Sequence, residues 1–185
     1  ANKIQATYLD HDSDRVDVLR KMGFKVFYGD ASRYDLLHAA GAADAKIIII
    51  AIDDAHKRLE LVETVKKHFP NLHMLVRASN RYDAYDLMNA GMLHVYRESL
   101  DTSLRVGVDA LGMLGFRNYT AKRLARTFLK HDEQTLKQLA AVHNTEGYIS
   151  KAREFIEEIE LIVQADAEGP ALADSAWDAE HLREE

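Results

Sequence analysis

The sequence contains no cysteine, which excludes disulfide bonds, Cys-ligated zinc, iron–sulfur clusters and thiol catalysis within these 185 residues. This composition fits a reducing compartment such as the cytosol. Long apolar runs are missing as well, since none approaches the roughly 20 residues needed to cross a bilayer. The opening ANKIQATYLDHD does not have the pattern of a signal peptide. The hydrophobic fraction of the whole sequence, 47%, is ordinary for a soluble globular protein.

Positive charge is in short supply, with 24 Lys and Arg against 30 Asp and Glu and a net charge of −6. This balance argues against nucleic-acid binding, which needs a basic face. Catalytic motifs are also absent: there is no HExxH, GxSxG or P-loop, and Tyr119 is followed by Lys122 rather than by a lysine four residues on. The nine histidines form no i, i+4 pair. The sequence therefore predicts neither catalytic residues nor a metal site.

The most informative stretch that is present is KIIIIAIDD, residues 46–54. Its β-branched residues favour a strand, and an apolar run without alternation predicts burial on both faces, as in a parallel sheet covered by helices. The run ends at Asp53 and Asp54. In open α/β sheets ligands bind beyond the carboxyl ends of the strands, so we expect a functional edge there.

Strand and helix patterns alternate five times along the first half of the chain, with short connections. This rhythm predicts an α/β fold with a Rossmann-like, doubly wound parallel sheet. The expected strands are 4–9, 25–28, 46–52, 72–76 and 92–96, and the expected helices are 13–22, 34–40, 55–69 and 82–90.

One unit of the dinucleotide-binding pattern is not in this sequence. In that fold a strand and a glycine-rich turn precede the first acid, here Asp10, by about 20 residues, and the strand is central in the order 3-2-1-4-5-6. Without it, two neighbouring strands would be unpaired. We therefore expect this strand and its glycine loop to lie upstream of residue 1.

From residue 99 onward the pattern becomes helical. Expected helices cover 100–114, 120–129, 133–142 and 150–163, with a break at His131 and Asp132. Their apolar stripes have few partners, so we expect them to pack against a second copy, the alternative being that they fold back on their own sheet. The predicted organisation is a nucleotide-binding domain at 1–98, a helical hinge and dimerisation region at 99–164, and a disordered acidic tail at 165–185 that contains Trp177.

Acids mark the ends of the predicted strands. Asp10 is suited to accept hydrogen bonds from ribose hydroxyls, and it would repel a 2′-phosphate. Asp30 and Ala31 are expected beside an adenine ring, and Asp53 near the middle of a nucleotide. The alternative for each acid, and for Asp54, is helix capping, and Ser13 is the expected cap of the first helix. A calcium loop at Asp10, Asp12 and Asp14 is disfavoured because the glycine and bidentate glutamate it requires are missing.

Two arginines follow the last two predicted strands. Arg77 and Arg97 are guanidinium groups at the ligand edge of an acidic protein, which suits a carboxylate or phosphate. Structural pairing with nearby acids is the alternative.

The chain resembles a known family in three segments: residues 8–54, LVRASN, and YRESLDTSLRVGVDALGMLG. They are similar to the cytoplasmic regulatory domain of the Kef glutathione-gated potassium efflux systems, within the family called KTN or RCK. The resemblance implies AMP or NAD(H) in the Rossmann cleft, bound by Asp10, Asp30, Ala31, Asp53 and Arg77.

The same resemblance implies a regulatory site for glutathione, which holds transport closed while its electrophile adducts open it. Arg97 matches the family's carboxylate contact. Met22 lies where relatives carry a bulky aromatic residue, and Asp132 where they carry asparagine. An acid at position 132 would suit the amino group of the tripeptide.

The implied partners are a second copy in a homodimer, the membrane transport domain upstream in the same protein, an accessory oxidoreductase subunit, and potassium ions carried by the membrane part. The implied location is the cytoplasmic face of the bacterial inner membrane. Two other functions share the fold. An NAD-dependent oxidoreductase needs a proton donor that the sequence does not offer, and a phospho-receiver needs a lysine where Arg77 and Arg97 stand.

Overall fold

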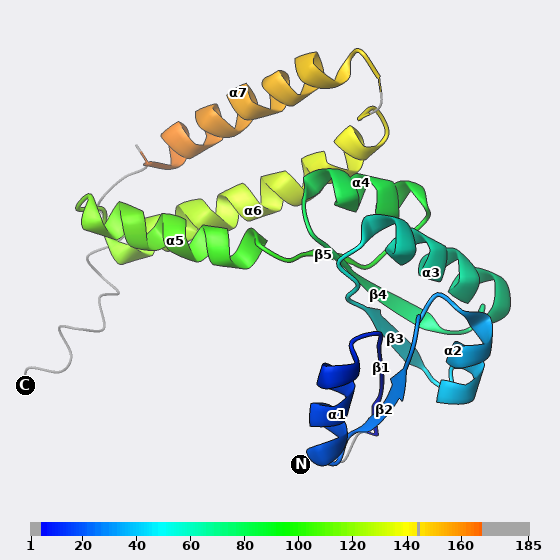
Figure 1. Ribbon diagram of the computed structural model, residues 1–185. Helices are drawn as coiled ribbons and strands as arrows, with labels where there is room; N and C mark the ends of the chain where they lie inside the picture. Colours follow the sequence, from blue (N-terminus) through cyan, green and yellow to red (C-terminus); the bar gives the residue numbers. More distant parts are fainter. Residues whose placement is uncertain (1–4, 144, 168–185) are drawn as a thin grey trace, which may run out of the picture. The chain divides into compact units, whose positions relative to one another are not determined.

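The computed structural model describes residues 5–143 and 145–167, which divide into two compact units between Glu98 and Ser99 (Figure 1). The first unit alternates strands and helices as expected. Its elements are β1 (Thr7–Asp10), α1 (Ser13–Lys21), β2 (Lys25–Tyr28), α2 (Tyr34–Ala40), β3 (Ile47–Ile50), α3 (Ala55–His68), β4 (His73–Ala78), α4 (Arg81–Asn89) and β5 (Val95–Arg97).

The strands of this unit are all parallel and form two sheets, one of β1 and β2 and one in the order β3-β4-β5. In the part of the chain that the structure describes, β1 pairs with β2 alone and β3 with β4 alone. The predicted α/β class and parallel, Rossmann-like sheet are confirmed.

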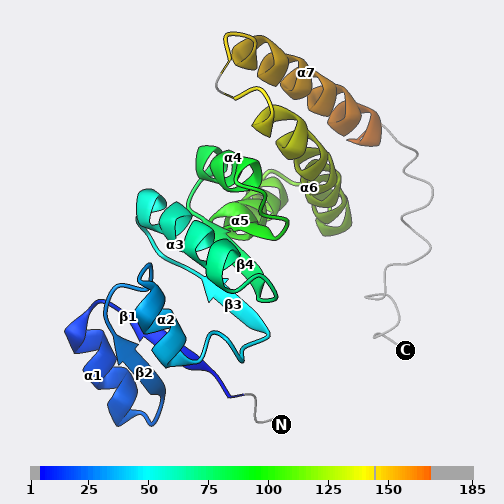
Figure 2. The ribbon, with the colours of Figure 1, turned by 90° about the vertical axis from the view of Figure 1, so that its right-hand side faces the viewer.

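Two contacts join these sheets on the side of α2 and α3. The ring of Tyr34, at the start of α2, stacks on Phe69 at the end of α3 with 5.7 Å between centroids. At the other end of α3, Lys57 reaches Asp30, which follows β2, at 2.9 Å. Helix α3 therefore bridges the two sheets at both of its ends (Figure 2).

Strand β3 differs from its prediction in one respect. Ile50 is 1% exposed, but Ile47 and Ile49 are 56% and 72% exposed, so the strand is buried on one face only. The expectation of burial on both faces was wrong here, because the side chains of Ile47 and Ile49 point to a face that no described residue covers completely. The unbroken isoleucine run still gives the strand its extended backbone.

The covered face of the three-stranded sheet forms a core with α3 and α4. Its fully buried side chains include Val62 and Val65 of α3, Val76 of β4, and Tyr85 and Leu87 of α4. Each such side chain stabilises the fold by about 1.5–3 kcal/mol through removal from water. This core fixes the carboxyl ends of β3, β4 and β5 as a rigid edge.

The second unit consists of α5 (Leu100–Met113), α6 (Asn118–Ala140) and α7 (Tyr148–Ala167). The predicted break at His131 and Asp132 was wrong, since α6 runs through both residues. Its buried stripe continues across the expected break at Leu124, Asp132 and Leu136. Packing of this stripe outweighs the weak helix propensity of the aspartate.

Helix α7 is longer than the predicted 150–163 and extends to Ala167, into the region expected to be an acidic tail. The rest of that tail, including Trp177, lies outside the described residues. None of the helices that the structure describes is both long enough and apolar enough to span a membrane.

Candidate functional site

Polar side chains gather where the five parallel strands of the first unit end. We define the strand-end edge as Asp10, Asp30, Asp53, Arg77 and Arg97. Asp10 and Arg97 are the last residues of β1 and β5, and Asp30 and Asp53 lie in the connections after β2 and β3. Arg77 lies within β4, one residue before its end, and not after the strand as the sequence predicted, because β4 continues to Ala78.

Asp10 is held by its own connection. Its Oδ1 accepts a hydrogen bond from the Asp12 amide at 3.0 Å, and its Oδ2 accepts one from Arg15 Nη1 at 3.1 Å. The cap of α1 is Asp12, and not Ser13 as predicted, because the Asp12 carboxylate reaches the amides of Asp14 and Arg15. A carboxylate has about four acceptor positions, so Asp10 keeps two for hydroxyl donors.

Asp30 carries the most strongly shifted carboxyl group of the edge. Its Oδ1 accepts hydrogen bonds from the Ser32 amide at 3.0 Å and hydroxyl at 2.9 Å, and its Oδ2 pairs with Lys57. The Lys57 hydrogen bond, followed by the Ser32 bonds, lowers the pKa of Asp30 from 3.8 to about 2. Neither Asp30 nor Ser32 caps α2, whose N-cap is Arg33 without a side-chain bond.

Gly29 makes this connection possible. Its φ of 143° lies in a region that side chains rarely adopt, and an added Cβ would come within 2.9 Å of a Leu36 methyl carbon. Its amide donates to the Asp10 carbonyl at 2.9 Å. Ala31 follows as a half-buried small residue. The turn thereby keeps Asp30 and Ala31 close to the end of β1.

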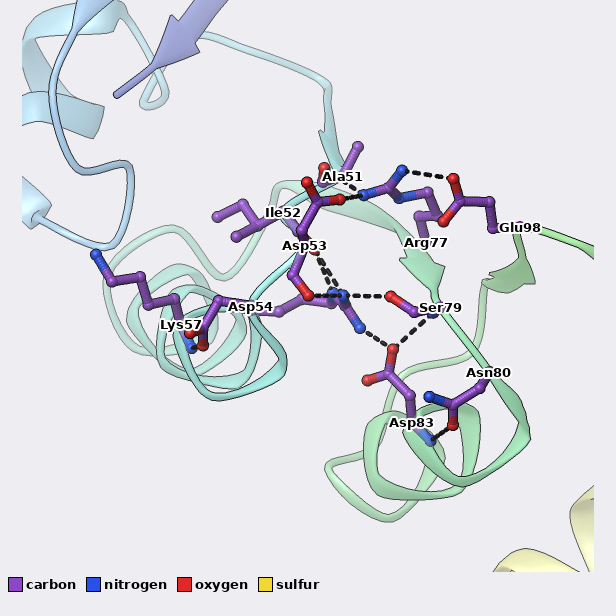
Figure 3. A network of polar contacts seen from close by, with 11 residues as sticks. Ala51, Ile52, Asp53, Asp54, Lys57, Arg77, Ser79, Asn80, Asp83 and Glu98 are labelled. Carbon is purple, nitrogen blue, oxygen red and sulfur yellow. Dashed lines mark hydrogen bonds and ion pairs between the residues drawn. The ribbon is translucent and has the colours of Figure 1, made fainter. Parts of the chain in front are cut away.

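The consecutive acids after β3 have different roles. Asp54 is the N-cap of α3, and its Oδ1 accepts the Lys57 amide at 2.8 Å. That backbone hydrogen bond lowers the pKa of Asp54. The Asp53 side chain points outward, is 95% exposed, and pairs with Arg77 (Figure 3). Of the two acids, Asp53 is thus the one presented at the edge.

Arg77 connects three strand ends. Its Nη2 donates to the carbonyl of Ala51 at 2.9 Å and to the Asp53 carboxylate, and its Nη1 lies 3.1 Å from Oε1 of Glu98 (Figure 3). Its Nε is buried and makes no hydrogen bond within the described structure. The Arg77 side chain is 27% exposed, so part of it is accessible from solvent.

The three residues assigned to glutathione belong to both units. In the first unit, Arg97 is half-buried at the carboxyl end of β5, whereas Met22 is the C-cap of α1, at the opposite edge, and is 67% exposed. Asp132 belongs to the second unit, where it is 5% exposed inside α6. Within the first unit, Arg97 and Met22 therefore lie apart.

Two hollows lie away from the strand-end edge. One, of about 290 Å³, is lined by residues of α2 and of the turn after α3, including Tyr34, His68 and Asn71. The other, of about 400 Å³, lies between α5 and α6 and has charged walls that include Arg105, Asp109 and Arg126.

Comparison with known families covers nearly the whole chain. Residues 1–98 match the TrkA-N domain, and residues 102–180 match the potassium efflux system KefB C-terminal domain. A solved structure of the Shewanella denitrificans Kef C-terminal domain in an AMP-bound form is 36% identical, with 73% of this chain and 96% of that chain covered and a TM-score of 0.63. The chain belongs to the Kef family of KTN/RCK regulatory domains.

Two more distant structures share the fold of this Kef domain. The TrkA-N domain of the inner membrane protein YbaL from Escherichia coli is 21% identical, with 58% and 79% of the two chains covered and a TM-score of 0.53. The NAD(P)-binding domain of an exopolyphosphatase-related protein from Archaeoglobus fulgidus is 14% identical, with 60% and 82% covered and a TM-score of 0.51. The family membership predicted from the three matching segments is confirmed.

Sequence reasoning missed two cations of this Kef domain, Lys57 and Arg58, on the first turn of α3. Lys57 pairs with Asp30, and Arg58 is fully buried beneath the turn that carries Asp53. From the sequence alone, a basic residue at a buried position of a helix is hard to distinguish from one at an exposed position. The position of Arg58 three residues before the buried Leu61 was the available signal.

Proposed function

We propose that this chain is the ligand-sensing gating domain of a potassium/proton efflux antiporter. An adenine nucleotide, AMP or NAD(H), binds at the strand-end edge. Glutathione holds transport closed, and glutathione adducts open it. The observation that carries the proposal is the alignment of acceptors and a cation along parallel strand ends in a Kef-family fold.

The nucleotide part rests on the charges of the edge. Asp10 retains acceptor positions for the two ribose hydroxyls, and Asp30 and Ala31 border the space for the base. The partly accessible Arg77 offers a guanidinium to a phosphate. The relative from Shewanella denitrificans, which was solved in an AMP-bound form, supports this class of ligand. Because Asp10 is an acid, the site selects against a 2′-phosphate.

The glutathione part rests on two copies of the chain. Arg97 would bind a carboxylate of the tripeptide and Asp132 its amino group, while Met22 would be displaced by a bulky adduct. In the proposed homodimer, two copies of the chain together supply the complete set. A ligand that bridges subunits shifts a two-state dimer only through its unequal affinity for the two arrangements. The change in the dimer is transmitted to the membrane transport domain at the cytoplasmic face of the inner membrane. An accessory oxidoreductase subunit is a further partner.

Calorimetric titration tests the proposal. Glutathione should bind the wild-type chain, and Arg97→Ala should weaken binding about 10- to 100-fold, because a hydrogen bond to a charged group contributes about 1.5–3 kcal/mol. Arg153→Ala, which removes an exposed arginine of α7, is the charge-matched control. Equal affinity of both variants for glutathione would remove Arg97 from the site.

The same titration with nucleotides tests the strand-end edge. AMP or NADH should bind, and NADPH should bind at least about tenfold more weakly because of repulsion by Asp10. Catalytic oxidation of NADH by small carbonyl compounds would instead favour an oxidoreductase.

A further inference from the structure

A fully buried arginine lies directly beneath the strand-end edge. Arg58, on the first turn of α3, has no exposed surface, and its partner Asp83 on α4 is 6% exposed. Buried charges are costly unless they are paired and their hydrogen-bonding groups are satisfied. The neighbouring core positions are apolar. The presence of a charged pair among them therefore needs a specific physical explanation.

The contacts of Arg58 converge on one segment of backbone. Its Nε and Nη2 donate to the carbonyl of Ile52 at 2.8 and 2.6 Å, and Nη2 also lies 3.0 Å from the carbonyl of Asp53 (Figure 3). These carbonyls belong to the turn between β3 and α3. Both peptide groups are therefore held from inside the protein, which leaves the Asp53 side chain facing outward.

The other contacts of Arg58 anchor this turn to the neighbouring strand end. Nη1 pairs with the Asp83 carboxylate, and Nη2 lies 3.0 Å from the Ser79 hydroxyl. Asp83 Oδ2 also accepts the Ser79 amide at 2.7 Å, and the Asp83 amide donates to Asn80 at 3.0 Å. One guanidinium thus connects the turns after β3 and β4 to α4.

We propose that Arg58 and Asp83 form a positioning pair that keeps the β3–α3 turn in its nucleotide-binding shape before any ligand arrives. This inference deepens the proposed nucleotide site and depends on it. A lysine cannot replace Arg58, because an ammonium lacks the planar fork that reaches two carbonyls, a hydroxyl and a carboxylate together. Preorganisation of this kind raises affinity by removing the ordering cost on binding.

Paired replacement separates positioning from simple stabilisation. Arg58→Met alone leaves a buried carboxylate without its partner and should destabilise the fold, whereas Arg58→Met with Asp83→Leu removes both charges, a change that is often tolerated. We expect the paired variant to recover most of the wild-type urea midpoint. Its dissociation constant for AMP should nevertheless rise at least tenfold, because nothing holds the carbonyls of Ile52 and Asp53.

Arg58→Lys is the second variant. It keeps a cation for Asp83 and should fold, and its affinity for AMP should fall as in the paired variant. The control is Lys66→Met, at the far end of α3, which should leave AMP affinity unchanged. If either folded Arg58 variant binds AMP as tightly as wild type, the pair is purely structural and the inference is overturned.

Hydrogen exchange on the wild-type chain tests, without any variant, whether the β3–α3 turn is ordered before AMP binds. The amides of Lys57 and Arg58, which donate to Asp54 within this turn, should already be protected when AMP is absent. Protection that appears there only after AMP is added would overturn preorganisation. A wild-type chain that binds no AMP would contradict the proposed nucleotide site instead, and the exchange of the ligand-free turn would still report on Arg58.

Discussion

At the scale of single residues, the pairing of Asp30 with Lys57 should be visible in titration. The folded-state pKa of about 2 lies below the ordinary 3.8, so the pair contributes stability that is complete above pH 4 and lost as pH falls toward 2. The groups are 36% and 49% exposed, so solvent screening limits the contribution to less than about 1 kcal/mol.

The prediction is that Lys57→Met raises the pKa of Asp30 toward 3.8. The pKa should remain somewhat below that value, because both Ser32 hydrogen bonds persist. An NMR titration of the side-chain carboxyl carbons measures it, with Lys67→Met, on the last turn of α3, as the control variant. An unchanged Asp30 pKa in Lys57→Met would show that the ion pair does not form in solution.

The residues of the edge were predictable to different degrees. The pattern of a strand ending in an acid located Asp10 and Asp53, because parallel strands deliver their last residues to one edge. Capping was predicted for Asp54 but assigned wrongly to Ser13, since Asp12 offers its carboxylate to the same amides. For Arg58 the sequence offered only its spacing from the buried Leu61, because its partner Asp83 lies 25 positions away.

At the scale of elements, α6 is the clearest test of the structure against the sequence pattern. The sequence places a helix start at Glu133, after a break, whereas the structure has Glu133 in the interior of a 23-residue helix. Proline is favoured in the first turn of a helix but removes a hydrogen bond and clashes in the interior.

Glu133→Pro should therefore destabilise the second unit by about 3 kcal/mol or more. Glu133→Ala, at the same exposed position, should be nearly neutral, since alanine favours helices. Urea unfolding followed by circular dichroism compares the two. A proline variant as stable as the alanine variant would restore the two-helix prediction.

The limits of element prediction have a common physical origin. Local periodicity located all five strands and the helices between them. It could not show that β3 would be covered on one face only, because that depends on what packs against each face of the sheet. Nor could it show that α6 is continuous. Packing along the buried stripe that holds Leu124 and Leu136 keeps His131 and Asp132 helical.

At the scale of the whole molecule, α5 has more apolar surface than a monomer normally presents to water. None of its residues is buried, and Val106, Met113 and the adjoining Leu114 are 63%, 89% and 76% exposed. Contiguous exposed apolar side chains usually mark an interaction surface. We propose that a homodimer buries this face.

Val106→Glu and Met113→Glu should each raise the dissociation constant of that dimer at least about tenfold, because burying one such side chain contributes about 1.5–3 kcal/mol and 1.4 kcal/mol corresponds to a factor of ten. Sedimentation equilibrium measures the constant. Ile149→Glu, which changes a 64% exposed residue of α7, is the matched control and should leave it unchanged. A wild-type chain that stays monomeric at tens of micromolar would contradict the dimer. A dimer weakened by the α7 variant and not by those in α5 would place the interface elsewhere.

Glutathione should in turn strengthen the dimer. A ligand bound across two subunits must raise their affinity for each other by the same factor by which the dimer raises affinity for the ligand.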